Sequence, residues 1–179
     1  MAKILPAYTS ISIMEPITIR TATEQDIPLI NELGERAFYP TYLPFISEEQ
    51  VSYMFHMMYD TAALRRQMQE RGDIFFIAYA GTEALGFASC QHLADGVTKL
   101  HKLYVLPELQ VKGVGKALLD SVEQAAAAAG QTRVLLNVNR ENKAIGFYRK
   151  CGYAIRAEDD IDIGNGFFMN DYEMIKSIY

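Results

Sequence analysis

A short glycine-rich segment carries the residue types that most clearly suggest chemistry. It reads QVKGVGK over residues 110–116 and follows an expected strand, residues 97–106, while a long helix is expected to begin near Gly113. Gly113 and Gly115 leave backbone N–H groups exposed, and the positive end of the helix would add to their attraction for anions. Two flanking lysines supply further positive charge, Lys112 and Lys116. The spacing predicts an anion site suited to a diphosphate, although a turn of this kind also serves packing alone.

Two better-known phosphate loops do not fit this segment. A Walker A loop needs GxxxxGK followed by Ser or Thr, but Gln110 occupies the place of its first glycine and Ala117 follows Lys116. A dinucleotide loop needs GxGxxG, and Leu118 occupies the place of its third glycine. The sequence therefore argues against both nucleotide-binding classes.

The histidines and cysteines give no sign of a metal site. The three histidines have no HxxH or HExxH spacing, and the two cysteines, Cys90 and Cys151, have no CxxC spacing. Reduced thiols in a core are the simpler interpretation, and they suit a cytoplasmic protein. We therefore expect no metal and no disulfide.

The elements that must position these residues follow from periodicity and capping. Apolar periodicity predicts helices over residues 23–38, 61–70, 113–129 and 142–150, with a further helix opened by a capping box at Ser47. Residues 38–45, FYPTYLPF, contain two prolines and are expected to form a loop. Strands are expected at 17–22, 74–80, 83–93, 97–106, 133–138, 153–163 and 167–175, the last two joined at Asn165-Gly166. This order predicts an α+β fold with a mixed sheet.

The composition and net charge limit the kinds of binding partner that we expect. The 179 residues are 50% hydrophobic and carry a net charge of −5. No basic domain for nucleic acid is implied, and no apolar run reaches the length of a membrane span. Residues 1–15 lack the features of a signal peptide and are expected to form a tail or arm. Residues 16–179 are expected to form one domain.

Several motifs occur together in the order typical of one enzyme family. The pattern Q-x-x-G-x-G directly after a strand, followed by VLLNVNRENKAIGFYRKCGY at residues 134–153, resembles the GNAT superfamily of N-acetyltransferases. The segments YLPFISEEQ, LHKLYVLPE and DIDIGNGFFMNDYEMIKSI are similar to its bacterial branch of PaiA-like spermidine/spermine acetyltransferases. The resemblance covers about residues 17–178.

The resemblance implies a mostly antiparallel central sheet with flanking helices and a cleft where two strands splay apart. It implies that acetyl-CoA, the co-substrate, lies in this cleft. The backbone of the strand expected at residues 97–106 would bond the pantetheine arm through Leu103, Tyr104 and Val105. Asn137 and Asn142 would contact that arm or hold its wall. The diphosphate would lie on Gln110, Val111, Lys112, Gly113, Val114, Gly115 and Lys116.

The resemblance also implies roles in catalysis. Tyr148 lies where the family places its general acid, and a phenol with a pKa of about 10 can protonate a thiolate whose conjugate acid has a pKa near 8.5. The residues alone would equally suit a tyrosine that packs beside Phe147. His101 is a candidate general base, and a water chain is the alternative. By alternation, Lys99, His101, Leu103 and Val105 are expected to share one face of their strand.

The function implied is direct transfer of an acetyl group to a primary amine of a small molecule, with a polyamine as one candidate. The loop at 38–45 would line the acceptor pocket or fill the core, and the acidic run at 158–162 would attract a polyamine or form a solvated strand face. Exposed strand edges favour a homodimer. The alternatives are a non-catalytic acyl-CoA-binding or regulatory module with the same fold, and an α+β scaffold with no cofactor.

Overall fold

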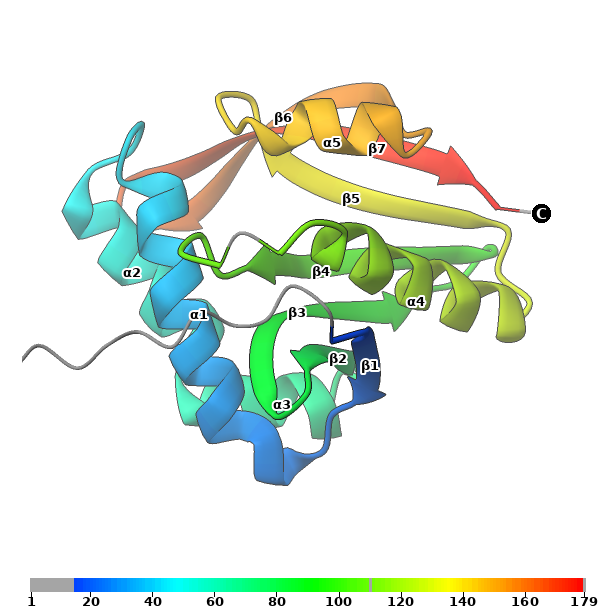
Figure 1. Ribbon diagram of the computed structural model, residues 1–179. Helices are drawn as coiled ribbons and strands as arrows, with labels where there is room; N and C mark the ends of the chain where they lie inside the picture. The colour runs from blue at the N-terminus through cyan, green and yellow to red at the C-terminus, as the bar shows by residue number, and fades with distance from the viewer. Residues whose placement is uncertain (1–14, 110, 179) are drawn as a thin grey trace, which may run out of the picture.

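A computed structural model describes residues 15–109 and 111–178. These residues build one seven-stranded sheet in the order β1-β2-β3-β4-β5-β7-β6 (Figure 1). The strands are β1 (Ile17–Thr21), β2 (Ile74–Ala80), β3 (Glu83–His92), β4 (Val97–Val105), β5 (Arg133–Asn139), β6 (Ala154–Gly164) and β7 (Phe167–Ser177). Neighbouring strands are antiparallel except β4 and β5, which are parallel. The predicted mixed, mostly antiparallel α+β fold is confirmed.

The helices cover both faces of the sheet. They are the short 3₁₀ turn η1 (Glu24–Asp26) and the helices α1 (Ile27–Tyr42), α2 (Glu48–Tyr59), α3 (Thr61–Gln69), α4 (Val114–Ala128) and α5 (Ala144–Lys150). Figure 1 shows α4 alongside β4 and α5 alongside β5, with α1 and α2 grouped at one end of the sheet. One core joins α4 and α5 to the sheet, and a second joins α1, α2 and α3 to its other face. Among the helices described, none has the length and apolar character needed to cross a membrane.

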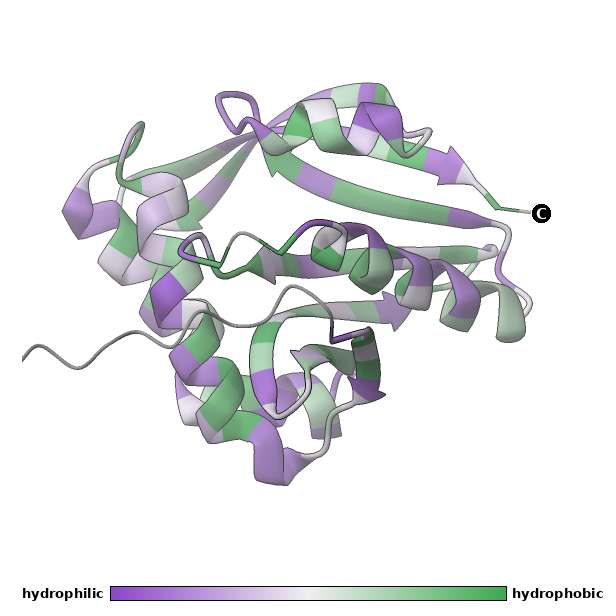
Figure 2. Cartoon of the chain, in the orientation of Figure 1, coloured by the Kyte–Doolittle hydropathy of each residue, from purple (hydrophilic) through white to green (hydrophobic). Residues whose placement is uncertain are grey.

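Local sequence signals account for most element boundaries. Ser47 accepts a hydrogen bond from the backbone N–H of Gln50 at 3.2 Å and caps α2 as predicted. Asn165 and Gly166 both adopt positive φ, which is the conformation required by the tight turn between β6 and β7. In Figure 2 hydrophilic bands interrupt the hydrophobic colour of β5, so this strand presents polar side chains to one side of the sheet. The expected N-terminal tail, residues 1–15, falls outside the described residues except for its last member.

The expectation of a loop at residues 38–45 is wrong. Helix α1 continues through Pro40 and ends at Tyr42. Proline removes one N–H donor, but the helix ends two residues later, so only its last turn is affected. The hydroxyl of Thr41 donates to the carbonyl of Ala37 at 2.7 Å, and the fully buried Phe38 packs against Tyr59. Aromatic packing therefore holds this turn in place.

The expected alternation along β4 is also wrong. The register against β3 shifts at Ser89/Cys90, which leaves His101 without a paired residue. Such a bulge inverts the side-chain order, so Leu100 lies in the same core as Leu103 and Val105. Lys99 and His101 therefore do not share a face with Leu103 and Val105.

Strands β4 and β5 separate along their length. They pair over four residues each, Val97–Leu100 with Arg133–Leu136. Beyond these pairs β4 continues to Val105 beside β3, and β5 continues to Asn139 beside β7. The splayed cleft expected from the resemblance is therefore present.

Candidate active site

A cavity of about 500 Å³ lies where β4 and β5 separate. That volume is typical of a site for a small molecule. Side chains from α1, α2, α3, α5 and β7 complete its wall. Half of the predicted site residues line it, namely His101, Leu103, Tyr104, Val105, Asn137, Asn142 and Tyr148. The structure thus brings residues that are far apart in the sequence to one place.

The inner edge of β4 offers backbone groups to a ligand. In the described part of the chain, β4 residues 102–105 pair with β3 on one side and have no strand partner on the β5 side. An extended arm can add to such an edge as an additional strand, bonded by main-chain N–H and C=O groups. This geometry fits the pantetheine contact expected for Leu103, Tyr104 and Val105.

The glycine-rich segment forms the N-terminal end of α4. Gly113 is the N-cap, with a φ of +91° that L side chains rarely adopt. The N–H groups of the first helical turn have no acceptor one turn earlier, so they remain available to an anion. Val111, Lys112, Gly113, Val114, Gly115 and Lys116 lie here and are not among the cavity-lining residues. Gln110 lies outside the described residues.

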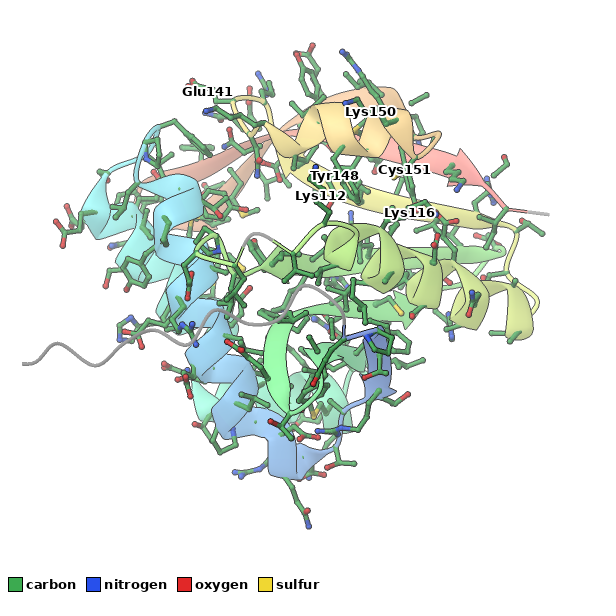
Figure 3. The ribbon with its side chains drawn as sticks, in the orientation of Figure 1. Lys112, Lys116, Glu141, Tyr148, Lys150 and Cys151 are labelled. Atoms are coloured by element: carbon green, nitrogen blue, oxygen red, sulfur yellow. The ribbon has the colours of Figure 1, made fainter. Side chains whose placement is uncertain are left out.

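The two lysines of this segment are solvent-exposed. Figure 3 shows Lys112 and Lys116 at the α4 side of the gap that Tyr148 faces from α5. Lys116 pairs with Asp120 one turn further along α4, whereas Lys112 is exposed just before Gly113. Both lysines lie beside the helix end, and their role in binding a diphosphate stays a prediction.

Tyr148 has the properties of a proton donor. It is 7% exposed, lines the cavity and packs against Phe147 and Tyr153. Burial raises the pKa of its phenol well above the usual value of a tyrosine. The phenol is therefore protonated at neutral pH and able to donate. Packing and proton donation are both compatible with this position.

His101 and Lys99 have depressed basicity. The Nε2 atom of His101 lies 3.2 Å from Oε1 of Gln91. Burial, followed by the nearby Arg71 guanidinium, lowers the pKa of His101 to about 4. Burial likewise lowers the pKa of Lys99, whose ammonium donates to Oδ1 of Asn137. His101 is thus neutral at neutral pH and a weak base.

Sequence reasoning missed Asp171. This residue of β7 is 2% exposed and lines the cavity, and burial raises its pKa to about 6. The charges of Lys99 and Arg140 oppose that rise. A carboxylate with this pKa is ionised at neutral pH and accepts protons better than an exposed aspartate. Alternation along β7 with Met169, which also lines the cavity, is the signal that could have found it.

Sequence reasoning also missed Lys102. Only 6% of it is exposed, and its ammonium donates to Oε1 of Gln67 at 2.9 Å. The ammonium also lies 5.3 Å from the ring centre of Tyr59 and 5.9 Å from that of Phe75. A lysine beside the apolar residues at the end of the strand was the available signal, since charged residues are rarely buried without a partner.

A splayed parallel strand pair, a glycine-capped helix beside it and a buried phenol at the gap define an acyl-CoA-dependent transferase. The sequence model of the acetyltransferase (GNAT) family matches residues 36–153. The chain belongs to this family, and it is an acetyl-CoA-dependent N-acetyltransferase.

Individual relatives agree with this assignment. The spermidine N(1)-acetyltransferase of Thermoplasma acidophilum is 28% identical over 151 residues, covering 82% of this chain and 93% of that protein. The crystal structure of the PaiA N-acetyltransferase from Thermoplasma acidophilum in complex with coenzyme A matches with a TM-score of 0.76 and 26% identity, covering 90% of this chain and 99% of that one. A GCN5-related N-acetyltransferase structure from Rhodopseudomonas palustris also has a TM-score of 0.76, at 25% identity, covering 89% and 94%.

Proposed function

We propose that this enzyme acetylates a primary amine of a small molecule by direct attack on acetyl-CoA, without an acyl-enzyme. The observation that supports this most is that a proton donor, Tyr148, and a proton acceptor, Asp171, line one cavity beside the free edge of β4. Direct attack needs both groups in addition to a place for the thioester. Cys151, which is partly buried and has a raised pKa, is not needed as a nucleophile.

The proposed co-substrate contacts follow the geometry of the cleft. The backbone of Leu103, Tyr104 and Val105 would bond the pantetheine arm, and Asn137 and Asn142 would hold its wall. The diphosphate would be bound by the start of α4 through Gln110, Val111, Lys112, Gly113, Val114, Gly115 and Lys116. Oriented N–H groups and a helix end supply what a diphosphate requires.

The proposed proton path uses two side chains. Asp171 accepts a proton from the ammonium, directly or through water, and the free amine attacks the thioester carbon. A backbone N–H of the β4 edge stabilises the oxyanion. Tyr148 gives its proton to the sulfur as the C–S bond breaks, and the proton released on amide formation returns to the phenol. His101 was the base expected from the sequence, but its pKa of about 4 makes Asp171 the better candidate.

A polyamine is one candidate acceptor. The match to a protein named spermidine N(1)-acetyltransferase supports it. The acidic run of β6 offers weaker support, because Asp160 and Glu158 pair with Arg140. Thr41 and Tyr42 from the end of α1 line the cavity, so part of the aromatic segment contributes to the acceptor wall while Phe38 fills the core.

The experiment that tests the function is release of free thiol from acetyl-CoA with a panel of amines. Turnover with at least one small amine is expected. A non-catalytic acyl-CoA-binding module would bind CoA and release no thiol above background with any amine. Retention of Tyr148 at the gap favours the enzyme over that alternative, since a binding module has no need of a proton donor there.

Three further expectations belong to this proposal. We treat residues 16–179 as one N-acetyltransferase domain, because all described strands belong to one sheet. A cytoplasmic location agrees with the buried, unpaired thiol of Cys90. A homodimer would cover the open edge of β6, whose Ile155 and Ile161 are exposed, and sedimentation velocity would test it.

A further inference from the structure

The cavity has a cationic end that the proposed proton path does not use. This end is lined by Lys102 of β4, Gln67 of α3 and Arg71, which follows the end of α3. None of the ion pairs in the described residues involves Lys102, whose ammonium donates to the neutral amide of Gln67. A buried ammonium without a carboxylate partner is costly, and a bound anion would offset that cost.

The side chains around Lys102 are held in place by contacts of their own. The amide nitrogen of Gln67 donates to the carbonyl of Met58 at 2.9 Å, which turns its oxygen toward Lys102. The guanidinium of Arg71 donates from Nε to the buried carboxylate of Asp73 at 2.7 Å. Asp73 forms its ion pair with Arg71, and its charge only partly opposes the effect of burial on Lys102, which forms no ion pair in the described part of the chain.

An acidic residue belongs to the same cavity. Asp171 of β7 lines it, and Lys99, which also lines it, lies near enough for its charge to oppose the rise in the Asp171 pKa. No carboxylate accompanies Lys102 on the cavity wall, where Asp171 is the single acidic residue among the described lining residues. The cavity wall thus carries one carboxylate, Asp171, with Lys99 near it, and a separate buried lysine, Lys102, that has no ion-pair partner among the described residues.

We propose that the acceptor is an amine that also carries a carboxylate, bound with its amino group toward Asp171 and its carboxylate toward Lys102. This rests on the proposed N-acetyltransferase function. A polyamine fits this charge distribution poorly, because its second ammonium would meet Lys102. An amino-acid-like zwitterion instead matches both Asp171 and Lys102. Its carboxylate would be the ion-pair partner that Lys102 lacks.

A purely structural role for Lys102 is the competing explanation. Its ammonium lies over the rings of Tyr59 and Phe75, and cation–π contact stabilises a lysine without any ligand. Under that explanation, removal of the charge would change the stability and would affect all acceptors alike. The two explanations therefore differ in whether replacing Lys102 changes the preference among acceptors.

Pairs of acceptors that differ only in the carboxylate provide the kinetic test. We would compare α- and ω-amino acids with their carboxamides, and include spermidine, by thiol release. The carboxamide of an α-amino acid is intrinsically the less basic amine and is more often unprotonated at neutral pH, so preference for the acid reports binding rather than reactivity. We expect KM to be lower for the best amino acid by about 10- to 100-fold, the range for a hydrogen bond to a charged group.

Variants test whether Lys102 is responsible for the preference for an acceptor that carries a carboxylate. Lys102→Met is expected to remove it by raising KM for the acid alone. Lys150→Met, which removes an exposed charge from α5, is the matched control and is expected to keep it. Gln67→Glu gives Lys102 a carboxylate partner and is expected to exclude the substrate carboxylate, which tests the idea again if Lys102→Met does not fold.

A binding measurement keeps the test independent of turnover. Burial, followed by the charge of Arg71, lowers the pKa of Lys102 to about 7 against the opposing charge of Asp73, and a carboxylate bound beside the ammonium would raise it. Calorimetry of an N-acetylamino acid in buffers of different ionisation enthalpy should therefore show proton uptake at pH 7 to 8 for the native enzyme. The uptake should be absent in Lys102→Met.

The outcomes separate the two proposals. Absence of thiol release with every amine would overturn the proposed function, while proton uptake on binding would still support the carboxylate site. Turnover that is as good with spermidine or carboxamides as with every amino acid would overturn the carboxylate site and leave the function standing. An unchanged acceptor preference in Lys102→Met and Gln67→Glu would show that Lys102 is structural.

Discussion

The hydroxyl oxygens of Tyr42 and Tyr104 lie 3.1 Å apart and join the last turn of α1 to β4. Burial raises the pKa of Tyr42 to about 12 and that of Tyr104 above its usual range, so both phenols stay protonated. Tyr42→Phe would leave the Tyr104 hydroxyl buried without this partner. We expect a loss of about 1 to 3 kcal/mol in the free energy of unfolding, measured by urea denaturation.

The double variant Tyr42→Phe/Tyr104→Phe completes this cycle. Removing both hydroxyls leaves no unsatisfied group, so the double variant should be more stable than the sum of the two single losses predicts. Strict additivity would show that the hydroxyl pair does not interact.

Gly113→Val should weaken CoA binding by at least about 10-fold, the loss of roughly one charge-assisted hydrogen bond. A valine cannot adopt the φ of +91° without strain, and the start of α4 would have to change shape. Calorimetry with CoA measures the effect. Gly130→Val is the matched control, because Gly130 has a φ of +75° just beyond the other end of α4. Both variants should lose stability. Equal CoA affinities of the two variants would show that the diphosphate does not bind at this helix end.

Tyr148→Phe should lower kcat by about 10²-fold and leave CoA affinity nearly unchanged. The ring keeps its packing on Phe147 and Tyr153, and the proton donor is lost. Tyr153→Phe is the control, since that phenol donates to Glu123 at 3.0 Å and does not line the cavity. A full kcat in Tyr148→Phe would mean that the thiolate leaves without this proton.

The pH dependence of kcat/KM should report Asp171. Because the pKa of this carboxyl is about 6, activity should fall about tenfold per pH unit below pH 6 as the base becomes protonated. Asp171→Asn should lower activity and remove this acidic limb. His101→Gln should keep the limb, since His101 has a pKa of about 4. A limb that survives in Asp171→Asn and vanishes in His101→Gln would identify His101 as the base.

Asp171 should also affect stability in a defined direction. Its folded pKa of about 6 lies above the unfolded value of about 3.9, so the folded state binds the proton more tightly. This contribution to the free energy of unfolding is fully present below about pH 4 and is lost as the pH rises through 6. Denaturation of Asp171→Asn should show a weaker gain between pH 6 and pH 4 than the native protein.

The acidic run of β6 can be tested separately by changing Asp159, Asp160 and Asp162 to Asn. We expect the KM of the best acceptor to stay unchanged, because Asp160 and Asp162 are exposed and Asp160 is occupied by Arg140. Steady-state kinetics at low and high salt measure this. A KM for spermidine that rises in the variant and loses its salt dependence would show that the run attracts a polyamine.

The order and type of the elements could be predicted from the sequence because most signals are local. The cap at Ser47, the turn at Asn165-Gly166 and the periodicity of α4 each act within a few residues. Pro40 misled the prediction, since tertiary packing of Phe38 holds the last turn of α1 despite the lost donor. Propensity describes an isolated segment and cannot include such packing.

Candidate site residues that belong to a sequence motif could be predicted. Those whose importance depends on burial could not. Tyr148 and the start of α4 lie at positions that the motifs name. Asp171 and Lys102 are ordinary charged residues in strands, and their significance depends on the cavity that other elements enclose around them. The bulge at His101 depends on the partner strand β3, so no pattern within β4 could reveal which side chains it turns toward the cavity.

The four residue pairs that join β4 to β5 have a mechanical consequence. Among the described strands, they alone hydrogen-bond the β1–β4 half of the sheet to the β5–β7 half. Tyr148 and Asp171 belong to the second half, while Lys102 and the free edge of β4 belong to the first. A change in the angle between the two halves would therefore move Tyr148 and Asp171 together, toward or away from the free edge of β4.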